Sequence, residues 1–181
     1  MVKRRAYDEE KLEELVLYVA DKMKDRPNFG ATVLNKVLFF ADFFHYAQYG
    51  RPITGADYYR LDHGPAPRRL LPVRLSLLNA GRAEMRERTV GTCTQQLLVP
   101  LDSPNLSKFS GTEIAVVDEV IEMVSGFTAV DISELTHRFD GWRIAGTRES
   151  IPYESIFLHS VPVSDADRAK AKELAALAPA S

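Results

Sequence analysis

The residues best suited to recognition chemistry surround one short loop, residues 63–67. Two prolines restrict its backbone there, and Gly64 permits a conformation that other residues rarely adopt. Tyrosine and arginine side chains flank this loop. Because these two residue types dominate the energetics of protein–protein contacts, the pattern predicts a partner-binding surface. Its predicted members are Lys36, Phe40, Tyr58, Tyr59, Arg60, His63, Gly64, Pro65, Arg68 and Arg69. For the arginines, solvated side chains beside a structural turn are the alternative.

Lys36 occupies an apolar stretch, where a lysine side chain must either extend to solvent or find a partner. We expect it to pair with a carboxylate. The same stretch contains Phe39, Phe40, Phe43 and Phe44. Four phenylalanines cover too much of one helix to face a single small core, so we expect some of them to reach an exposed patch. Burial of all four in the core is the alternative.

Catalytic chemistry finds little support in the sequence. The histidines lack the spacing of a zinc-binding HExxH motif, and there is no glycine-rich phosphate loop and no Gly-x-Ser-x-Gly motif. These histidines are His45, His63, His137 and His159. His63 and His137 could meet in space with Asp42 or Asp62, but nothing in the sequence requires it. We therefore predict that the chain is not an enzyme, with no catalytic residues, no metal and no cofactor.

A basic middle segment keeps a nucleic-acid partner in consideration. Residues 51–90 carry eight basic and four acidic side chains, whereas residues 91–181 carry seven and thirteen. The predicted order of helix, helix and hairpin is also that of a winged helix. The arginines that could contact phosphates are Arg74, Arg82, Arg86 and Arg88. Glu84 and Glu87 alternate with them, which favours cross-strand ion pairs and makes nucleic acid the weaker candidate partner.

Apolar periodicity predicts the elements that position these residues. Helices are expected over residues 8–24, 31–49, 68–80, 110–125 and 131–139, a short strand over 56–61, and a hairpin over 82–90 and 93–100. Asp8 and Ser110 are expected as N-caps, and Gly50 as a helix end. A peripheral last helix is predicted from Ser164 to Leu177. The fold class is therefore mainly α (α+β), a compact helical domain with a small β-hairpin and a short extra strand.

Length and composition bound the domain organisation and the compartment. The chain has 181 residues, which suits one domain, so we predict a single domain over residues 1–160 and a peripheral C-terminal helix and tail over 161–181. One cysteine, Cys93, excludes an intramolecular disulfide and favours the cytoplasm. No apolar region follows the basic first residues and no apolar run of about 18 residues exists, so we expect neither a signal peptide nor a membrane span.

Three motifs in order resemble the phage-associated family of SocA-like antitoxins, whose domain is also called Panacea. The first is Asn35 to Asp42, and the second runs from Gly50 through the two tyrosines to residues 63–67. The third is Leu135-Thr136-His137 with Trp142, followed by Ile151 and Ile156. Together they span roughly residues 10–158. Ala66 replaces a larger aliphatic residue, and Asp140-Gly141 stands where many members have a proline, two mild departures.

This resemblance implies an antitoxin that neutralises a cognate protein toxin by direct binding, the toxin being encoded by an adjacent gene. One alternative is a proteolytic adaptor that delivers the toxin to an ATP-dependent protease. A second, from the residues themselves, is a winged-helix-like DNA-binding regulator. The resemblance brings no catalytic residues and no cofactor. It implies a structural family motif made of Leu135, Thr136, His137 and Trp142.

Overall fold

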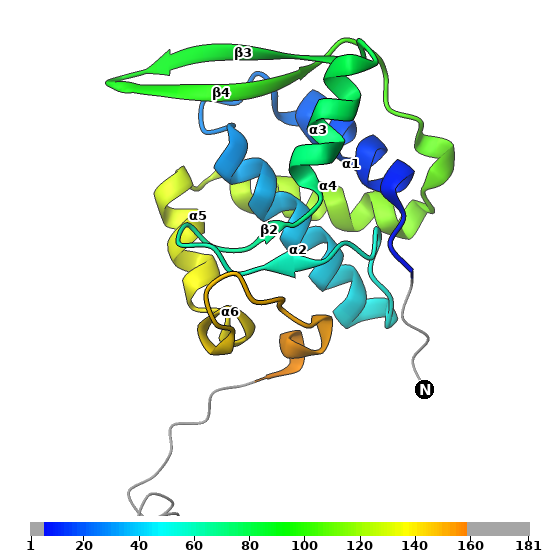
Figure 1. Cartoon of the computed structure of the whole chain (residues 1–181), viewed down its shortest axis with the longest axis vertical. Helices are drawn as coiled ribbons and strands as arrows, with labels where there is room; N and C mark the ends of the chain where they lie inside the picture. Colours follow the sequence, from blue (N-terminus) through cyan, green and yellow to red (C-terminus); the bar gives the residue numbers. More distant parts are fainter. Residues whose placement is uncertain (1–5, 159–181) are drawn as a thin grey trace, which may run out of the picture.

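The structure, a computed structural model that describes residues 6–158, is built around one central helix, α2 (Ala31–Tyr49) (Figure 1). The other helices are α1 (Glu9–Met23), α3 (Leu70–Asn79), α4 (Gly111–Ser125), α5 (Ala129–His137), α6 (Asp140–Ile144) and the 3-10 helices η1 (Leu106–Lys108) and η2 (Tyr153–Phe157). Two antiparallel strand pairs complete it: β1 (Tyr58–Tyr59) with β2 (Ala66–Pro67), and β3 (Ala83–Val90) with β4 (Cys93–Pro100). The mainly α fold class is confirmed. The predicted C-terminal helix and tail lie outside the described residues.

The core surrounds α2 on several sides, because α1, α4, α5 and η2 all pack against it. Phe39 and Phe43 are completely buried, their ring centroids 4.2 Å apart, and both rings contact Phe139. Phe40 is buried and Phe44 half-buried. The expectation of an exposed phenylalanine patch is therefore wrong, since neighbours cover most of the circumference of α2. No helix within residues 6–158 has both the length and the apolar character needed to cross a membrane.

Side-chain caps fix the ends of the main helices. The carboxylate of Asp8 accepts a hydrogen bond from the Lys11 backbone N–H at 3.0 Å, as expected for the N-cap of α1. At α4, Ser110 and Glu113 form a capping box. Gly50 ends α2 in the left-handed conformation, with φ of 69°. These three predicted boundaries are confirmed because each depends on local chemistry.

The segment around α5 and α6 departs from the sequence-based expectation. Thr128 and Asp131 form a capping box, so α5 begins two residues before the predicted start. The chain becomes extended at Phe139, and α6 then begins at Asp140, where the sequence predicted only a helix end. At α3, Pro72 is the third helical residue, where its missing N–H removes no helical hydrogen bond.

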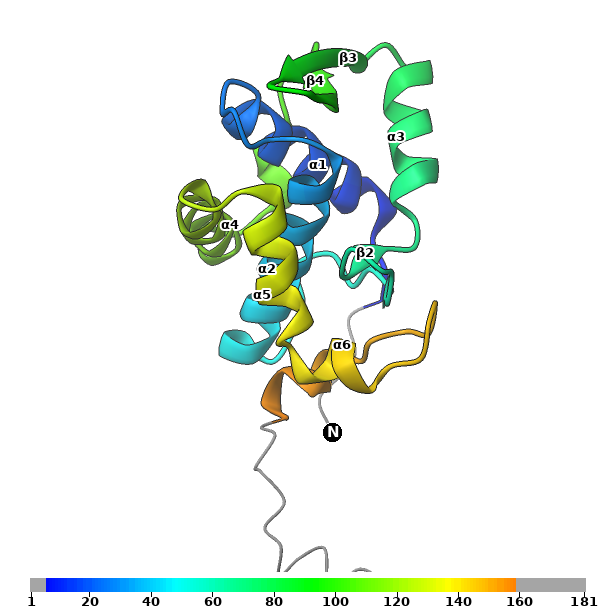
Figure 2. The ribbon, with the colours of Figure 1, turned by 90° about the vertical axis from the view of Figure 1, so that its left-hand side faces the viewer.

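The short strand expected over residues 56–61 contains β1, which pairs with a neighbouring segment on each side. On one side β1 pairs with β2, with Tyr58 opposite Pro67, although residues 63–67 were expected to form only a loop. On the other side the backbone N–H of Ile151 donates to Tyr58 O at 2.7 Å and that of Arg60 donates to Glu149 O at 2.9 Å. This ladder places loop 60–65 and segment 146–151 beside each other. With α3 they form one side of the molecule (Figure 2).

The β3–β4 hairpin covers the upper end of α1 and α2 (Figure 1). Leu97 and Leu98 of β4 are buried in the core. The Arg88 guanidinium donates to the backbone oxygens of Arg26 at 2.8 Å and Phe29 at 2.9 Å, which lie in the connection between α1 and α2. The hairpin therefore stabilises that connection.

Candidate functional site

One exposed part of the site is a stacked pair, Tyr59 on β1 and Arg68 just after β2. The Arg68 guanidinium carbon lies 4.6 Å from the centroid of the Tyr59 ring. Its Nε donates to the Asp57 carboxylate at 2.7 Å and Nη2 donates to Arg148 O at 3.0 Å, while 41% of the side chain stays exposed. A guanidinium held on three sides loses little conformational entropy when a partner binds.

A second stack joins the strand ladder to α5 and α6. The Arg60 guanidinium carbon lies 4.3 Å from the Trp142 ring centroid, and His137 stacks on the same tryptophan at 4.2 Å with an interplanar angle of 21°. Trp142 Nε1 donates to Leu61 O at 3.1 Å. The Arg60 guanidinium donates to Ala145 O at 2.7 Å. His137 and Trp142 thus connect helices α5 and α6 to loop 60–65.

The remaining motif residues support α5 from within. Thr136 is fully buried and its hydroxyl donates to Ser133 O at 2.7 Å. Leu135 is half-buried and packs against the core. The structure therefore brings Leu135, Thr136, His137 and Trp142 into one region, where α5 and α6 face the loop.

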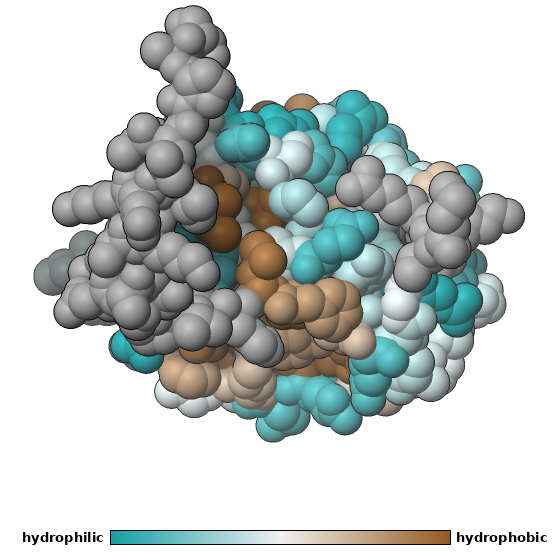
Figure 3. Space-filling model, turned by 90° about the horizontal axis from the view of Figure 1, so that it is seen from below, coloured by the Kyte–Doolittle hydropathy of each residue, from teal (hydrophilic) through white to brown (hydrophobic). Residues whose placement is uncertain are grey.

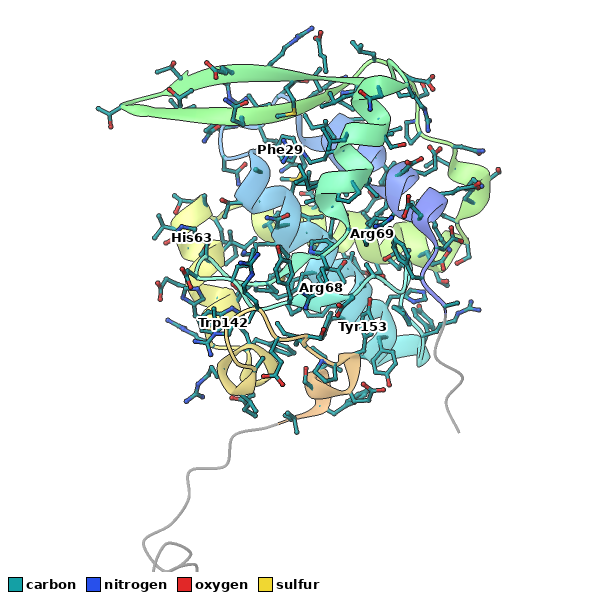
Figure 4. All side chains as sticks on the ribbon, viewed as in Figure 1. Phe29, His63, Arg68, Arg69, Trp142 and Tyr153 are labelled. Carbon is teal, nitrogen blue, oxygen red and sulfur yellow. The ribbon has the colours of Figure 1, made fainter. Side chains whose placement is uncertain are left out.

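The two stacks belong to a wider surface, which we call the arginine–aromatic face. It consists of Tyr59, Arg60, His63, Arg68 and Arg69, together with Leu71 and Leu75 of α3. Of these residues, Figure 4 labels His63, Arg68 and Arg69. Arg69 forms an exposed ion pair with Glu9 at 2.7 Å. The two leucines are 64% and 49% exposed. Sequence reasoning missed them, although apolar residues occur on more than one side of this helix, more than a single buried face needs.

The other predicted binding residues lie inside the chain: Lys36, Phe40, Tyr58, Gly64 and Pro65 are all buried. They are therefore not available as an exposed binding surface in this structure. The role of the exposed residues in partner binding stays a prediction.

Lys36 is 1% exposed, and its ammonium nitrogen lies 3.3 Å from Pro65 O. The expectation of a carboxylate partner is wrong, because α2 and the loop bring a carbonyl oxygen, not an acid, to this position. Burial lowers the pKa of Lys36 to about 8. Gly64 has φ of 94°, and a Cβ atom there would lie 2.8 Å from Lys36 Nζ and 2.4 Å from Thr136 Oγ1. Only glycine fits this position beside the ammonium group without displacing either side chain.

Asp42 is the opposite charge on the same helix, and it is fully buried. It accepts hydrogen bonds from the Thr54 backbone N–H at 2.7 Å, the Thr54 hydroxyl at 2.5 Å and the Tyr58 hydroxyl at 2.8 Å. Burial raises the pKa of Asp42, and these three donors partly oppose that shift. Asp42 therefore holds the 51–55 turn and β1 against α2. Its hydrogen-bond partners are Thr54 and Tyr58, whereas the metal-site alternative required a histidine beside it.

The contacts of the described residues support neither a metal site nor a phosphate-binding hairpin. Within residues 6–158, no three His, Cys, Asp or Glu side chains lie close enough to hold a metal ion. The hairpin arginines make contacts inside the chain: Arg82 with Glu14 at 2.8 Å and Asp102 at 3.0 Å, and Arg86 with Glu84. Arg88 donates to backbone oxygens, and the Arg74 guanidinium lies 3.3 Å from the Met85 sulfur.

Comparison with protein families gives a match over much of the chain. Residues 34–143 match the family model described as antitoxin SocA-like, Panacea domain, which is more than half of the chain. The matched range contains most of α2, the β1–β2 pair, α3, the hairpin, α4, α5 and the Trp142 stack. No curated protein and no solved structure matches the chain.

Proposed function

The chain belongs to the SocA-like antitoxin family with its Panacea domain, as the ordered motifs predicted, and from this we propose that it neutralises a cognate protein toxin by binding it directly. Family membership indicates a toxin–antitoxin role with a protein toxin as partner. The proposal adds that the toxin is the product of an adjacent gene and that binding takes place in the cytoplasm. It assigns the chain no catalytic step.

The observation that carries this proposal is the arginine–aromatic face. Arginine and tyrosine side chains are frequent anchors of protein interfaces, and they contribute most where they are held in place before binding. Tyr59 with Arg68, and Arg60 with Trp142, are two such pre-arranged anchors. Exposed Leu71 and Leu75 add apolar area beside them.

The DNA-binding alternative receives less support from the contacts. A winged helix binds DNA through basic side chains that are available to phosphates. Arg82 and Arg88 are committed to contacts inside the chain, and Arg86 is paired with a neighbouring glutamate. Toxin delivery to an ATP-dependent protease uses the same first contact and differs only in what happens to the toxin afterwards.

The test is co-expression of the chain with the product of each adjacent gene. We expect one such product to arrest growth, to be neutralised by this chain and to co-purify with it. Arg68→Ala and Tyr59→Ala should each weaken the complex by about tenfold or more, measured by calorimetry. Arg86→Ala is the matched control, because Arg86 is also an exposed, ion-paired arginine but lies on the hairpin.

Several results would contradict the proposal. If no adjacent product is neutralised, the antitoxin function fails for this chain. If Arg68→Ala and Tyr59→Ala both bind the toxin as tightly as the wild type, the interface lies elsewhere. The steady-state level of the toxin separates the two modes, since delivery to a protease removes it and occlusion leaves it intact.

A further inference from the structure

A cleft of about 270 Å³ lies between the first half of α2 and the loop that follows β1. Its lining includes Asn35 and Lys36 of α2 and Asp62, His63 and Gly64 of the loop. Lys36 is buried and Asn35 half-buried, whereas Asp62 and His63 are exposed. The cleft adjoins the arginine–aromatic face, because His63 belongs to both.

The charge on Lys36 has no counter-ion in the part of the chain that the structure describes. An ammonium group offers three donors, and Pro65 O at 3.3 Å is its single acceptor among residues 6–158. Asp62 is the acidic residue of the cleft lining, yet no ion pair joins it to Lys36 in the described structure. A buried charge without a counter-ion is costly. With its pKa lowered to about 8 by burial, Lys36 still carries that charge at pH 7.

Asn35 provides a second, independent observation. Its side-chain oxygen is buried and has no hydrogen-bond partner among the described residues, and the residue lines the same cleft. Buried polar atoms are rarely left in this state. Rotation of the amide exchanges its donor and acceptor edges, so Asn35 can equally donate to an oxygen bound beside Lys36.

We propose that this cleft receives a carboxylate of the partner toxin, either an acidic side chain or the C-terminal carboxylate, which pairs with Lys36 and hydrogen-bonds to Asn35. This inference rests on the proposed antitoxin function and names the chemistry of one contact in it. A water molecule would satisfy hydrogen bonds but not the charge. Sites that hold a whole small-molecule ligand usually measure about 300–1,000 Å³, so a cleft of 270 Å³ favours one protruding group over a free metabolite.

The first arm of the test measures toxin affinity. Lys36→Met in the full chain retains the length and apolar stem of lysine and removes the charge. We expect it to weaken toxin binding by about 30-fold or more, because one partner of a buried interfacial ion pair is lost. Lys22→Met, at an exposed lysine of α1, is the matched control and should bind normally. Lys36→Gln repeats the measurement if the methionine variant does not fold.

The second arm uses acetate as a probe of the chain without toxin. The Lys36 side-chain resonance is followed by NMR against pH, in acetate and in chloride of equal ionic strength. Acetate should raise the pKa of Lys36 more than chloride does, because a carboxylate stabilises the charged form. Lys36→Met should remove the acetate-dependent signal.

Each outcome decides part of the proposal. Normal toxin affinity of both Lys36 variants overturns it and leaves the antitoxin function intact. Equal effects of acetate and chloride overturn recognition of a carboxylate. An acetate response combined with unchanged toxin affinity overturns the toxin as its source and assigns a free carboxylate instead. If the wild type binds the product of no adjacent gene, the proposed function fails. The acetate titration then decides by itself whether the cleft recognises a carboxylate.

Discussion

Lys11 on α1 and Lys36 on α2 are both almost completely buried, at 2% and 1% exposure, but their surroundings differ. The Lys11 ammonium lies 2.7 Å from both carboxylate oxygens of Glu113, and the Phe109 ring centroid is 5.2 Å away. Lys36 has one carbonyl oxygen at 3.3 Å. Both lysines are thus buried to the same degree. Lys11 has a counter-ion, whereas Lys36 has none among the residues that the structure describes.

The location of each lysine explains this difference. Glu113 is also the capping-box residue of α4, so its pair with Lys11 fixes α1 against the start of α4. Lys36 instead points toward a loop at the edge of the arginine–aromatic face. We infer that the first buried charge serves the fold and the second serves binding, and three measurements of stability test the distinction.

The largest expected effect is that of Lys11→Met. It leaves the Glu113 carboxylate buried without its cation, so we expect the free energy of unfolding to fall by about 3–5 kcal/mol in urea titrations. Combining it with Glu113→Gln removes the remaining charge and should recover part of the loss. A loss below about 1 kcal/mol would show that this ion pair is not structural.

Lys36→Met should have the opposite sign. Burial lowers the pKa of folded Lys36 from 10.5 to about 8, a difference of roughly 3 kcal/mol, so we expect the variant to be more stable at pH 7 by about 1–3 kcal/mol. Between pH 8 and 10.5 the unfolded chain binds the extra proton, so wild-type stability should rise toward that of the variant. Paired urea titrations from pH 7 to 10.5 measure this. A destabilised variant would mean that Pro65 O stabilises the charge sufficiently.

The smallest effect is expected for Arg68→Ala. Its ion pair with Asp57 is exposed, and such pairs contribute little to stability. We therefore expect the free energy of unfolding, measured by urea titration, to change by less than about 1 kcal/mol. The variant should nevertheless lose toxin affinity. A large loss of stability would instead assign Arg68 to the framework, alongside Lys11.

Sequence reasoning succeeded where local chemistry decides the structure. The boundaries of α2 follow from Gly30 and Gly50, and the capping box at Ser110 follows from its spacing. It missed β2, because a two-residue strand ending in Pro67 has no periodicity and proline argues against a strand. It missed α6, because Gly141 reads as a helix end until tertiary packing is known.

The candidate site was chosen by residue type, and its role in binding stays a prediction. Arg68 and Arg69 are exposed, whereas Gly64 and Pro65 of the loop are buried. The partner of Lys36 could not be found in this way, because Pro65 lies 29 residues further along the chain. A usable signal was nevertheless present: a helix as apolar as α2 is covered on most sides, so any charge on it is expected to be buried.

The close approach of Gly64 to Lys36 has a consequence for how this family can vary. A larger residue at position 64 would collide with the lysine amine and with Thr136, while a shorter residue at position 36 would remove one of these collisions. Shortening residue 36 would leave the collision with Thr136 and the left-handed φ of 94° in place. We therefore expect relatives to keep glycine at position 64 even where position 36 is not a lysine.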